Sequence, residues 1–80
     1  METLRTYLNG LALGRQREFA IKCETTIEYL RKAISKGQKL GPALSVLIEI
    51  HSAGVVSRKD LHPTDWMKIW PELNSKANAA

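Results

Sequence analysis

The sequence predicts a single all-α domain, a compact bundle of about five short helices. The chain has only 80 residues, of which 44% are apolar and 25% are charged. Apolar residues recur at helical spacing, and signals for the start and end of a helix divide the chain into short segments. A chain of this size buries only about 60% of the surface that it exposes when unfolded, so we expect a thin core.

The first two helices are predicted from the apolar pattern. Leu4, Tyr7, Leu8 and Leu11 fall at positions i, i+3, i+4 and i+7 of a first helix, which Gly10 should end. A second helix is expected over residues 15–22, with no clear capping side chain unless Gly14 serves. This segment should bury Phe19, Ala20 and Cys23.

A third helix is expected to start at a capping box formed by Thr25 and Glu28, and to end at Gly37. Pro42 should open a fourth helix that is closed by Gly54. This fourth helix is apolar on more than one face, so it is either central to the core or shared with a partner.

The C-terminal part of the chain predicts two short helical segments. Ser57 and Asp60 have the spacing of a cap for the first, and Thr64 is a candidate cap for the second, which Pro71 should stop. We therefore expect one domain over residues 1–72 and a disordered tail over residues 73–80.

The positive charge of the chain is concentrated in one segment. The net charge is +4, and residues 15–39 hold seven Lys or Arg against three Glu, which accounts for the whole surplus. A basic segment between two neutral ones indicates a surface that faces a polyanion, with a solvated helix face as the alternative.

Several classes of site are not expected from the sequence. A single cysteine rules out a disulfide framework, and Cys23 is predicted to be a small buried apolar residue. His51 and His62 lack a second pair of ligands, so no metal is expected, and no catalytic arrangement stands out. We therefore expect no enzyme, no cofactor and, without a signal segment or long apolar run, a cytoplasmic protein without a membrane span.

Residues 20–37 resemble the helix-turn-helix of phage Cro and repressor proteins. Ala20 lies where two helices must touch closely, and Leu30 and Ala33 anchor the second helix ahead of Gly37. A wider resemblance, to the YdaS-like group of prophage Cro and antitoxin regulators, covers residues 29–35 (Tyr-Leu-Arg-Lys-Ala-Ile-Ser), Pro42, 60–63 (Asp-Leu-His-Pro), 65–66 (Asp-Trp) and 69–71 (Ile-Trp-Pro).

This resemblance implies a lambda-repressor-like fold with its motif at about residues 15–37. It also implies a protein of a bacterial or phage-infected cell that binds an operator and controls phage or toxin–antitoxin genes. Two residues depart from the pattern. Glu24 occupies a turn position where such motifs favour Gly, at a cost of about 1 kcal/mol if the backbone there is left-handed. Ile27 stands where relatives place a polar side chain that reads bases.

In such a motif the second helix lies in the major groove. Arg31 is the strongest candidate for a base contact, because a guanidinium can bond guanine O6 and N7 together. Ile27 is expected to contact a thymine methyl, and Glu28 either completes the cap or accepts from cytosine N4. The candidate base contacts are Thr26, Ile27, Glu28, Arg31, Lys32 and Ser35.

Phosphate contacts position such a domain without reading its sequence. The candidates are Arg15, Arg17, Tyr29, Lys36 and Lys39, each of which has the alternative of facing water or, for Tyr29, of packing.

The expected partner is double-stranded DNA, bound by a homodimer on a palindromic operator. Trp66, Ile69 and Trp70 are candidates for the oligomer contact, with packing inside the protomer as the alternative. The rival interpretation is a protein-interaction module, such as an antitoxin that neutralises a toxin or an anti-repressor.

Overall fold

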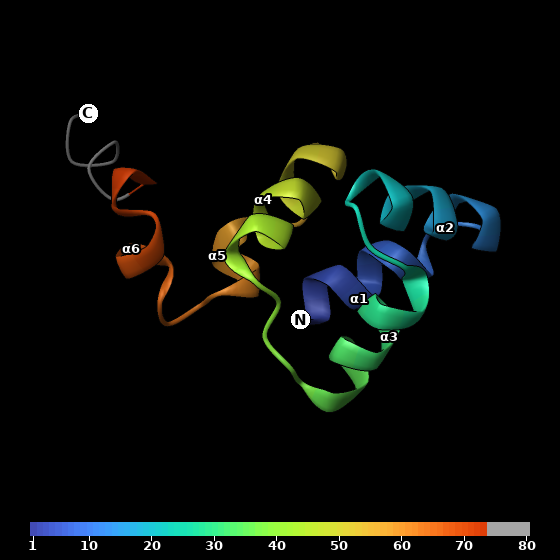
Figure 1. Ribbon diagram of the computed structural model, residues 1–80, viewed down its shortest axis with the longest axis horizontal. Coiled ribbons are helices and arrows are strands. Elements are labelled where there is room, and N and C mark those ends of the chain that lie inside the picture. The colour runs from blue at the N-terminus through green and yellow to red at the C-terminus, as the bar shows by residue number, and fades with distance from the viewer. Residues whose placement is uncertain (74–80) are drawn as a thin grey trace.

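The computed structural model describes residues 1–73, and the regular elements of this part of the chain are helices without any strand (Figure 1). The labelled helices are α1 (Glu2–Asn9), α2 (Leu13–Lys22), α3 (Ile27–Lys36), α4 (Pro42–His51), α5 (Arg58–Leu61) and α6 (Trp66–Ile69), and residues 71–73 are helical as well. Helices α1, α2 and α3 gather at one end, α4 and α5 lie in the middle, and α6 lies at the other end. The predicted all-helical class is confirmed.

The core is made by the apolar faces of the first four helices, with further residues from α5 and from the loops on either side of α4. Leu4 and Leu8 of α1, Ala20 of α2 and Leu30 of α3 are completely buried. Cys23 belongs to the same cluster at 1% exposure, as predicted for a small apolar residue. Burial raises the pKa of its thiol to about 11, because the charged thiolate would lose its hydration.

Helix α2 begins two residues before the predicted position. Ala12 has extended backbone and precedes the first turn, so Gly14 lies inside the helix and does not cap it. No side chain caps this end. Gln16 donates instead from Nε2 to the carbonyl oxygen of Leu11, 2.9 Å away, which fixes the entry of the chain into the helix.

Because of the way α2 ends, α3 starts one residue later than predicted. Glu24 has a left-handed backbone (φ 63°), and the amide of Thr25 donates to the carbonyl of Ala20 across 2.9 Å. This is the Schellman pattern of helix termination. Since Thr25 is used in closing α2, the cap of α3 is Thr26, whose Oγ1 accepts from the amide of Tyr29 at 3.1 Å. The predicted capping box of Thr25 and Glu28 is therefore wrong.

The same termination recurs at the ends of α3 and α4. Gly37 is left-handed (φ 65°), as predicted, and Gln38 donates to the carbonyl of Ala33. After α4 the left-handed position is taken by Ala53 (φ 55°), and Gly54 follows with φ 83°. Gly54 thus lies one residue beyond the position that ends this helix.

The C-terminal segment folds back onto α4. Ser57 and Asp60 form the predicted capping box of α5. The predicted Thr64 cap is wrong: Asp65 is the residue before α6, and it makes no side-chain cap. Its carboxylate is used elsewhere, with Oδ1 3.2 Å from His62 Nδ1 and Oδ2 3.3 Å from Lys39 Nζ.

Trp70 packs inside the protomer. Its side chain is 7% exposed, its ring meets the ring of His62 edge to face at 5.4 Å, and the guanidinium of Arg58 lies 5.3 Å from its centroid. Of the two alternatives left open for Trp70, the structure shows packing inside the protomer. Trp66 and Ile69 are half-buried, with Lys59 Nζ 4.4 Å from the Trp66 ring.

The expected disordered tail began at residue 73. Leu73 is instead helical and half-buried, and its amide donates to the carbonyl of Trp70 at 3.0 Å. The rest of that expectation, residues 74–80, lies outside the described residues.

Candidate nucleic-acid interface

Helices α2 and α3 form a packed pair joined by a short turn. Ala20 of α2 and Leu30 and Ala33 of α3 are each no more than 1% exposed and belong to one cluster. The small side chain of Ala20 permits a close approach of the two helices. The pair therefore presents the outer side of α3 as a continuous polar face beside the exposed residues of α2.

The outer face of α3 carries Glu28, Lys32 and Ser35, which share one side of the helix because they are four and three residues apart. All three are exposed, and so are Thr26 and Lys36 at the ends of the helix. Tyr29, at 40% exposure, borders this face. Of the six candidate base contacts, Thr26, Glu28, Lys32 and Ser35 are exposed on or beside the outer face, and Arg31 lies at its border. Only Ile27 does not belong to this face.

Ile27 is the exception. Its side chain is only 7% exposed and is part of the core, since it follows the cap Thr26 and lies on the same stripe of α3 as Leu30 and Ile34. Ile27 therefore does not project outward from α3, and only its edge reaches the surface, where it lines the hollow beside α2. Glu28, in contrast, is released from the capping role, because Thr26 alone caps the helix.

Arg31 is held in place by the two preceding helices. Its guanidinium donates to Asn9 Oδ1 and to Gln16 Oε1, each at 2.9 Å, and its side chain is half-buried. A guanidinium has five N–H donors, so these bonds leave donors free for another acceptor. The strongest candidate for base reading is thus oriented by α1 and α2.

Sequence reasoning missed Asn9 and Gln16 as partners of Arg31. They lie 22 and 15 residues away from it in the chain, and no periodicity within one helix relates residues so far apart. The available signal was weaker: Arg31 lies at the edge of the apolar stripe of α3, where a long side chain can turn toward a neighbouring helix.

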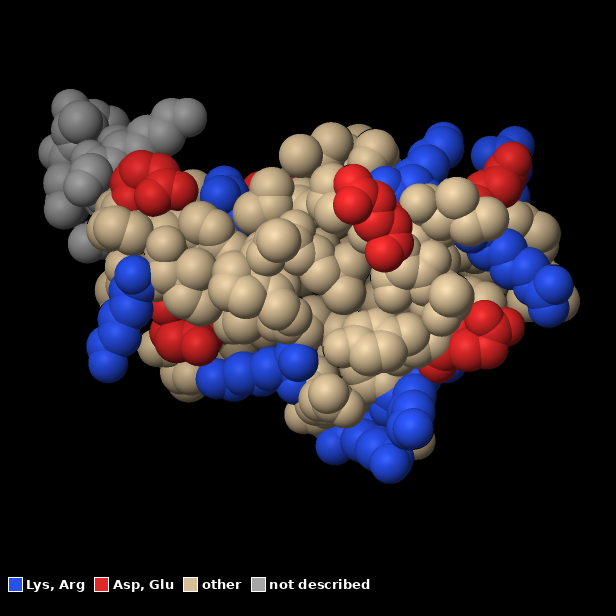
Figure 2. Space-filling model, in the orientation of Figure 1, with Lys and Arg blue, Asp and Glu red and all other residues tan. Residues whose placement is uncertain are grey.

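The candidate phosphate contacts occupy two regions. Arg15 and Arg17 are exposed on α2; Arg15 lies 4.0 Å from Glu18, whereas Arg17 makes no ion pair with another residue of the described chain. Lys36 is exposed at the end of α3. Figure 2 shows Lys and Arg side chains projecting from the half of the molecule that α2 and α3 occupy.

Lys39 is separated from this group by its ion pair with Asp65, although 59% of its side chain is exposed. Partial burial of Asp65 tends to raise the pKa of its carboxyl. The hydrogen bond and charge of Lys39, together with those of His62, outweigh this and hold that pKa below its usual range. Lys39 thus connects the loop before α4 to the C-terminal segment.

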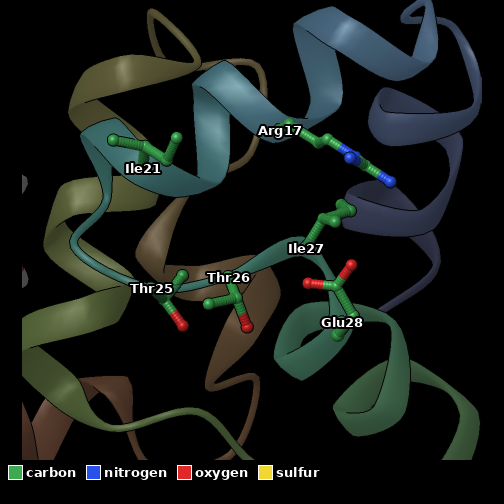
Figure 3. Close-up of a pocket in the computed structure, with 6 residues that line it drawn as sticks. All are labelled: Arg17, Ile21, Thr25, Thr26, Ile27 and Glu28. Atoms are coloured by element: carbon green, nitrogen blue, oxygen red, sulfur yellow. The ribbon is translucent and has the colours of Figure 1, made fainter.

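A shallow hollow of about 170 Å³ opens between α2 and the start of α3. Its lining, drawn in Figure 3, is Arg17, Ile21, Thr25, Thr26, Ile27 and Glu28. Ile21 is 71% exposed, the largest exposed fraction among the large apolar side chains of the described chain.

Comparison of the chain with family models, with curated proteins and with solved structures finds no match. Among residues 1–73, no helix combines the length and the apolar character needed to cross a membrane. In the same part of the chain, no three His, Cys, Asp or Glu residues are grouped so as to hold a metal ion.

Proposed function

We propose that this protein is a sequence-specific, double-stranded DNA-binding transcriptional regulator, a Cro-like repressor that binds a palindromic operator and occludes a promoter. The observation that carries the proposal is the outer face of α3. It is polar and exposed, and it lies inside the segment that holds the whole positive surplus of the chain.

An α-helix fits the major groove of B-DNA, where each base pair presents a distinct set of donors and acceptors. On α3, Lys32 supplies a donor for guanine and Glu28 an acceptor for an amino group of cytosine or adenine. Arg31, which Asn9 and Gln16 orient, adds guanidinium donors beside them. These three side chains give the face both signs of charge, which supports reading of bases over attraction to phosphates alone.

Phosphate contacts come from cations that flank this face. Arg15 and Arg17 on α2 and Lys36 at the end of α3 are exposed and serve this role, and Tyr29 adds a hydroxyl. Each neutralised phosphate releases counterions, so binding should weaken as salt increases. Lys39 contributes less, because Asp65 already compensates its charge.

One such motif makes few base contacts, so tight binding requires two copies on a palindrome. We propose a homodimer for this reason. With Trp70 buried within the protomer, the dimer contact must use other surfaces.

The test is a fluorescence anisotropy titration of the protein against duplexes from its own upstream region and against random duplex, at several salt concentrations. Lys32→Ala should weaken specific binding and reduce the slope of log K against log salt by up to about one unit if the ammonium also lies near phosphate. Lys68→Ala is the matched control, because Lys68 is exposed on α6, far from α3 (Figure 1). Equal affinity for random duplex would refute specific binding, and equal effects of the two variants would refute the assigned face.

A second candidate is a protein-interaction module of the antitoxin or anti-repressor kind. It is favoured by apolar side chains outside α2 and α3, where Ile50, Val55 and Met67 are each more than half exposed. This function predicts a stable complex with another protein that Lys32→Ala leaves intact and that Ile50→Asp weakens, as measured by calorimetry.

A further inference from the structure

The hollow between α2 and the start of α3 has a hydrocarbon wall. Ile21 on α2 is 71% exposed, and Ile27, which is only 7% exposed, also lines the hollow. Thr25 and Thr26 add methyl groups. Because the hydroxyl of Thr26 is used in capping α3, the methyl is the group that this residue leaves available to a ligand.

Two charged side chains of opposite sign line the hollow as well. Arg17 approaches it from α2 and Glu28 from the first turn of α3, and their charged groups lie on the same side of it as Ile27 (Figure 3). Within the described chain neither forms an ion pair or a side-chain hydrogen bond. A ligand in the hollow would therefore meet an apolar wall, one cation and one carboxylate.

We propose that this hollow receives the C5-methyl group of a pyrimidine in the major groove. The inference rests on the proposed DNA-binding function and names one position that the protein reads. The methyl contacts Ile21 and the two threonine methyls, Glu28 accepts from an exocyclic amino group beside it, and Arg17 bonds the adjacent phosphate. The apolar contact to a methyl discriminates between bases because among the unmodified bases of DNA only thymine carries one in this groove.

The lining argues for this ligand over simpler ones. A phosphate alone would be repelled by Glu28 and would gain nothing from Ile21. A wholly apolar ligand would leave Arg17 and Glu28 without partners, and a shallow hollow cannot enclose it. Duplex DNA supplies all three groups together, and the positive surplus of residues 15–39 favours its approach.

Thymine and 5-methylcytosine both carry a C5-methyl group, and they differ in the group that they present to Glu28. Thymine has an acceptor, O4, next to its methyl, so Glu28 would need the amino group of a neighbouring adenine or cytosine. In 5-methylcytosine the methyl and the N4 amino group lie on one ring. The shared chemistry is the methyl, and the probes below separate the two sources.

The probes are duplexes selected by the purified full-length protein from a random library, prepared unmethylated. Each thymine is replaced in turn by deoxyuridine, which removes only the methyl, and each cytosine in turn by 5-methyldeoxycytidine. For the unaltered protein we expect one uridine replacement per half-site to weaken binding about fourfold, the factor expected for losing one buried methyl-sized group. If 5-methylcytosine is the natural source, a methylated cytosine at that position strengthens binding by a similar factor.

Ile21→Ala should make the methylated and unmethylated duplexes bind equally. Its exposure means that the substitution removes no core contact. Ile50→Ala, which alters an equally apolar residue 61% exposed on α4, should preserve the fourfold ratio and serves as the matched control.

The outcomes separate this inference from the function on which it rests. If every methyl can be removed or added without effect while selected duplexes still bind, the methyl hollow is refuted and DNA binding stands. A methyl effect that persists in Ile21→Ala also overturns the assignment. If no duplex binds even at low salt, the proposed function fails and this inference falls with it.

Discussion

The substitution Glu24→Gly should stabilise the protein. Glu24 ends α2 with a left-handed backbone (φ 63°), a conformation that costs an L residue roughly 1–2 kcal/mol and glycine almost nothing. Glycine loses more backbone entropy on folding, which offsets about 0.5–1 kcal/mol of that gain. Glu24 is exposed and forms no ion pair within the described chain, so no contact is lost. The net expectation is a gain of about 1 kcal/mol in the free energy of unfolding.

Urea unfolding followed by tryptophan fluorescence measures this gain directly. For a domain of this size a change of 1 kcal/mol corresponds to about 4–8 °C in Tm, well within the resolution of a thermal scan. The slope of free energy against urea should stay unchanged, because the substitution does not alter the surface that is buried on folding.

Two control substitutions distinguish left-handed strain from a general effect of glycine. Lys22→Gly, in the last turn of α2, should destabilise the protein by about 0.5–1 kcal/mol. Gly37→Ala should also destabilise it, by about 1 kcal/mol, because φ is 65° there and a Cβ would meet no neighbour within 4 Å, so the cost is conformational alone. If Glu24→Gly lowered the stability as Lys22→Gly does, the argument from the left-handed backbone would be refuted.

The remaining predictions concern side chains that join elements. Arg31→Ala should lower the free energy of unfolding by about 1 kcal/mol, because two hydrogen bonds from a half-exposed guanidinium are lost. Asn9→Ala removes one of these bonds and should lower it by less. If urea unfolding gave the same stability for the unaltered protein and both variants, Arg31 would not join the helices energetically. Because the pKa of Asp65 is lowered in the folded state, its contribution to stability is present above the ordinary Asp value of about 3.9 and is lost as pH falls through the lower folded value. Lys39→Ala should reduce the loss of unfolding free energy between pH 5 and pH 2. If the dependence of stability on pH did not change in this variant, the Lys39–Asp65 pair would not be the source of that loss. Because burial raises the pKa of Cys23 to about 11, its thiol should react with Ellman's reagent at pH 8 only as the protein unfolds, and immediate native-state labelling would refute the burial.

Local signals in the sequence predicted local structure well. The all-helical class, the cap of α5 at Ser57 and Asp60, and the left-handed Gly37 each depend on residues within one turn of a helix, and the structure contains all three. The boundary between α2 and α3 was misplaced by one residue. Thr25 and Thr26 are both good caps, and the choice between them depends on the closing hydrogen bond from Thr25 to Ala20.

The error at Ile27 has a different origin: Ile27, Leu30 and Ile34 are at positions i, i+3 and i+7, so their spacing already places Ile27 on the buried stripe of α3, whereas the resemblance assigned it to the outer face. With the cap at Thr26, Ile27 is the first residue of α3, and Glu28 has no capping role and is exposed on the outer face.

The hydrogen-bond partners of Arg31 lie 15 or more residues away from it in the chain. The burial of Trp70 depends on how the C-terminal segment folds back, which places Arg58 against its ring. Such contacts are not encoded in a local pattern.

The hydrogen bonds from Arg31 to Asn9 and Gln16 have a consequence for the selectivity of the proposed DNA binding. A free arginine loses roughly 0.5–1.5 kcal/mol of side-chain entropy when a partner immobilises it. Part of that entropy is already lost on folding, because Arg31 bonds to Asn9 and Gln16, so under the proposed function its guanidinium would need less ordering to contact a base. A side chain with so little freedom would adjust poorly to a misplaced acceptor, so the proposed base contact would select by geometry as well as by the hydrogen bonds formed.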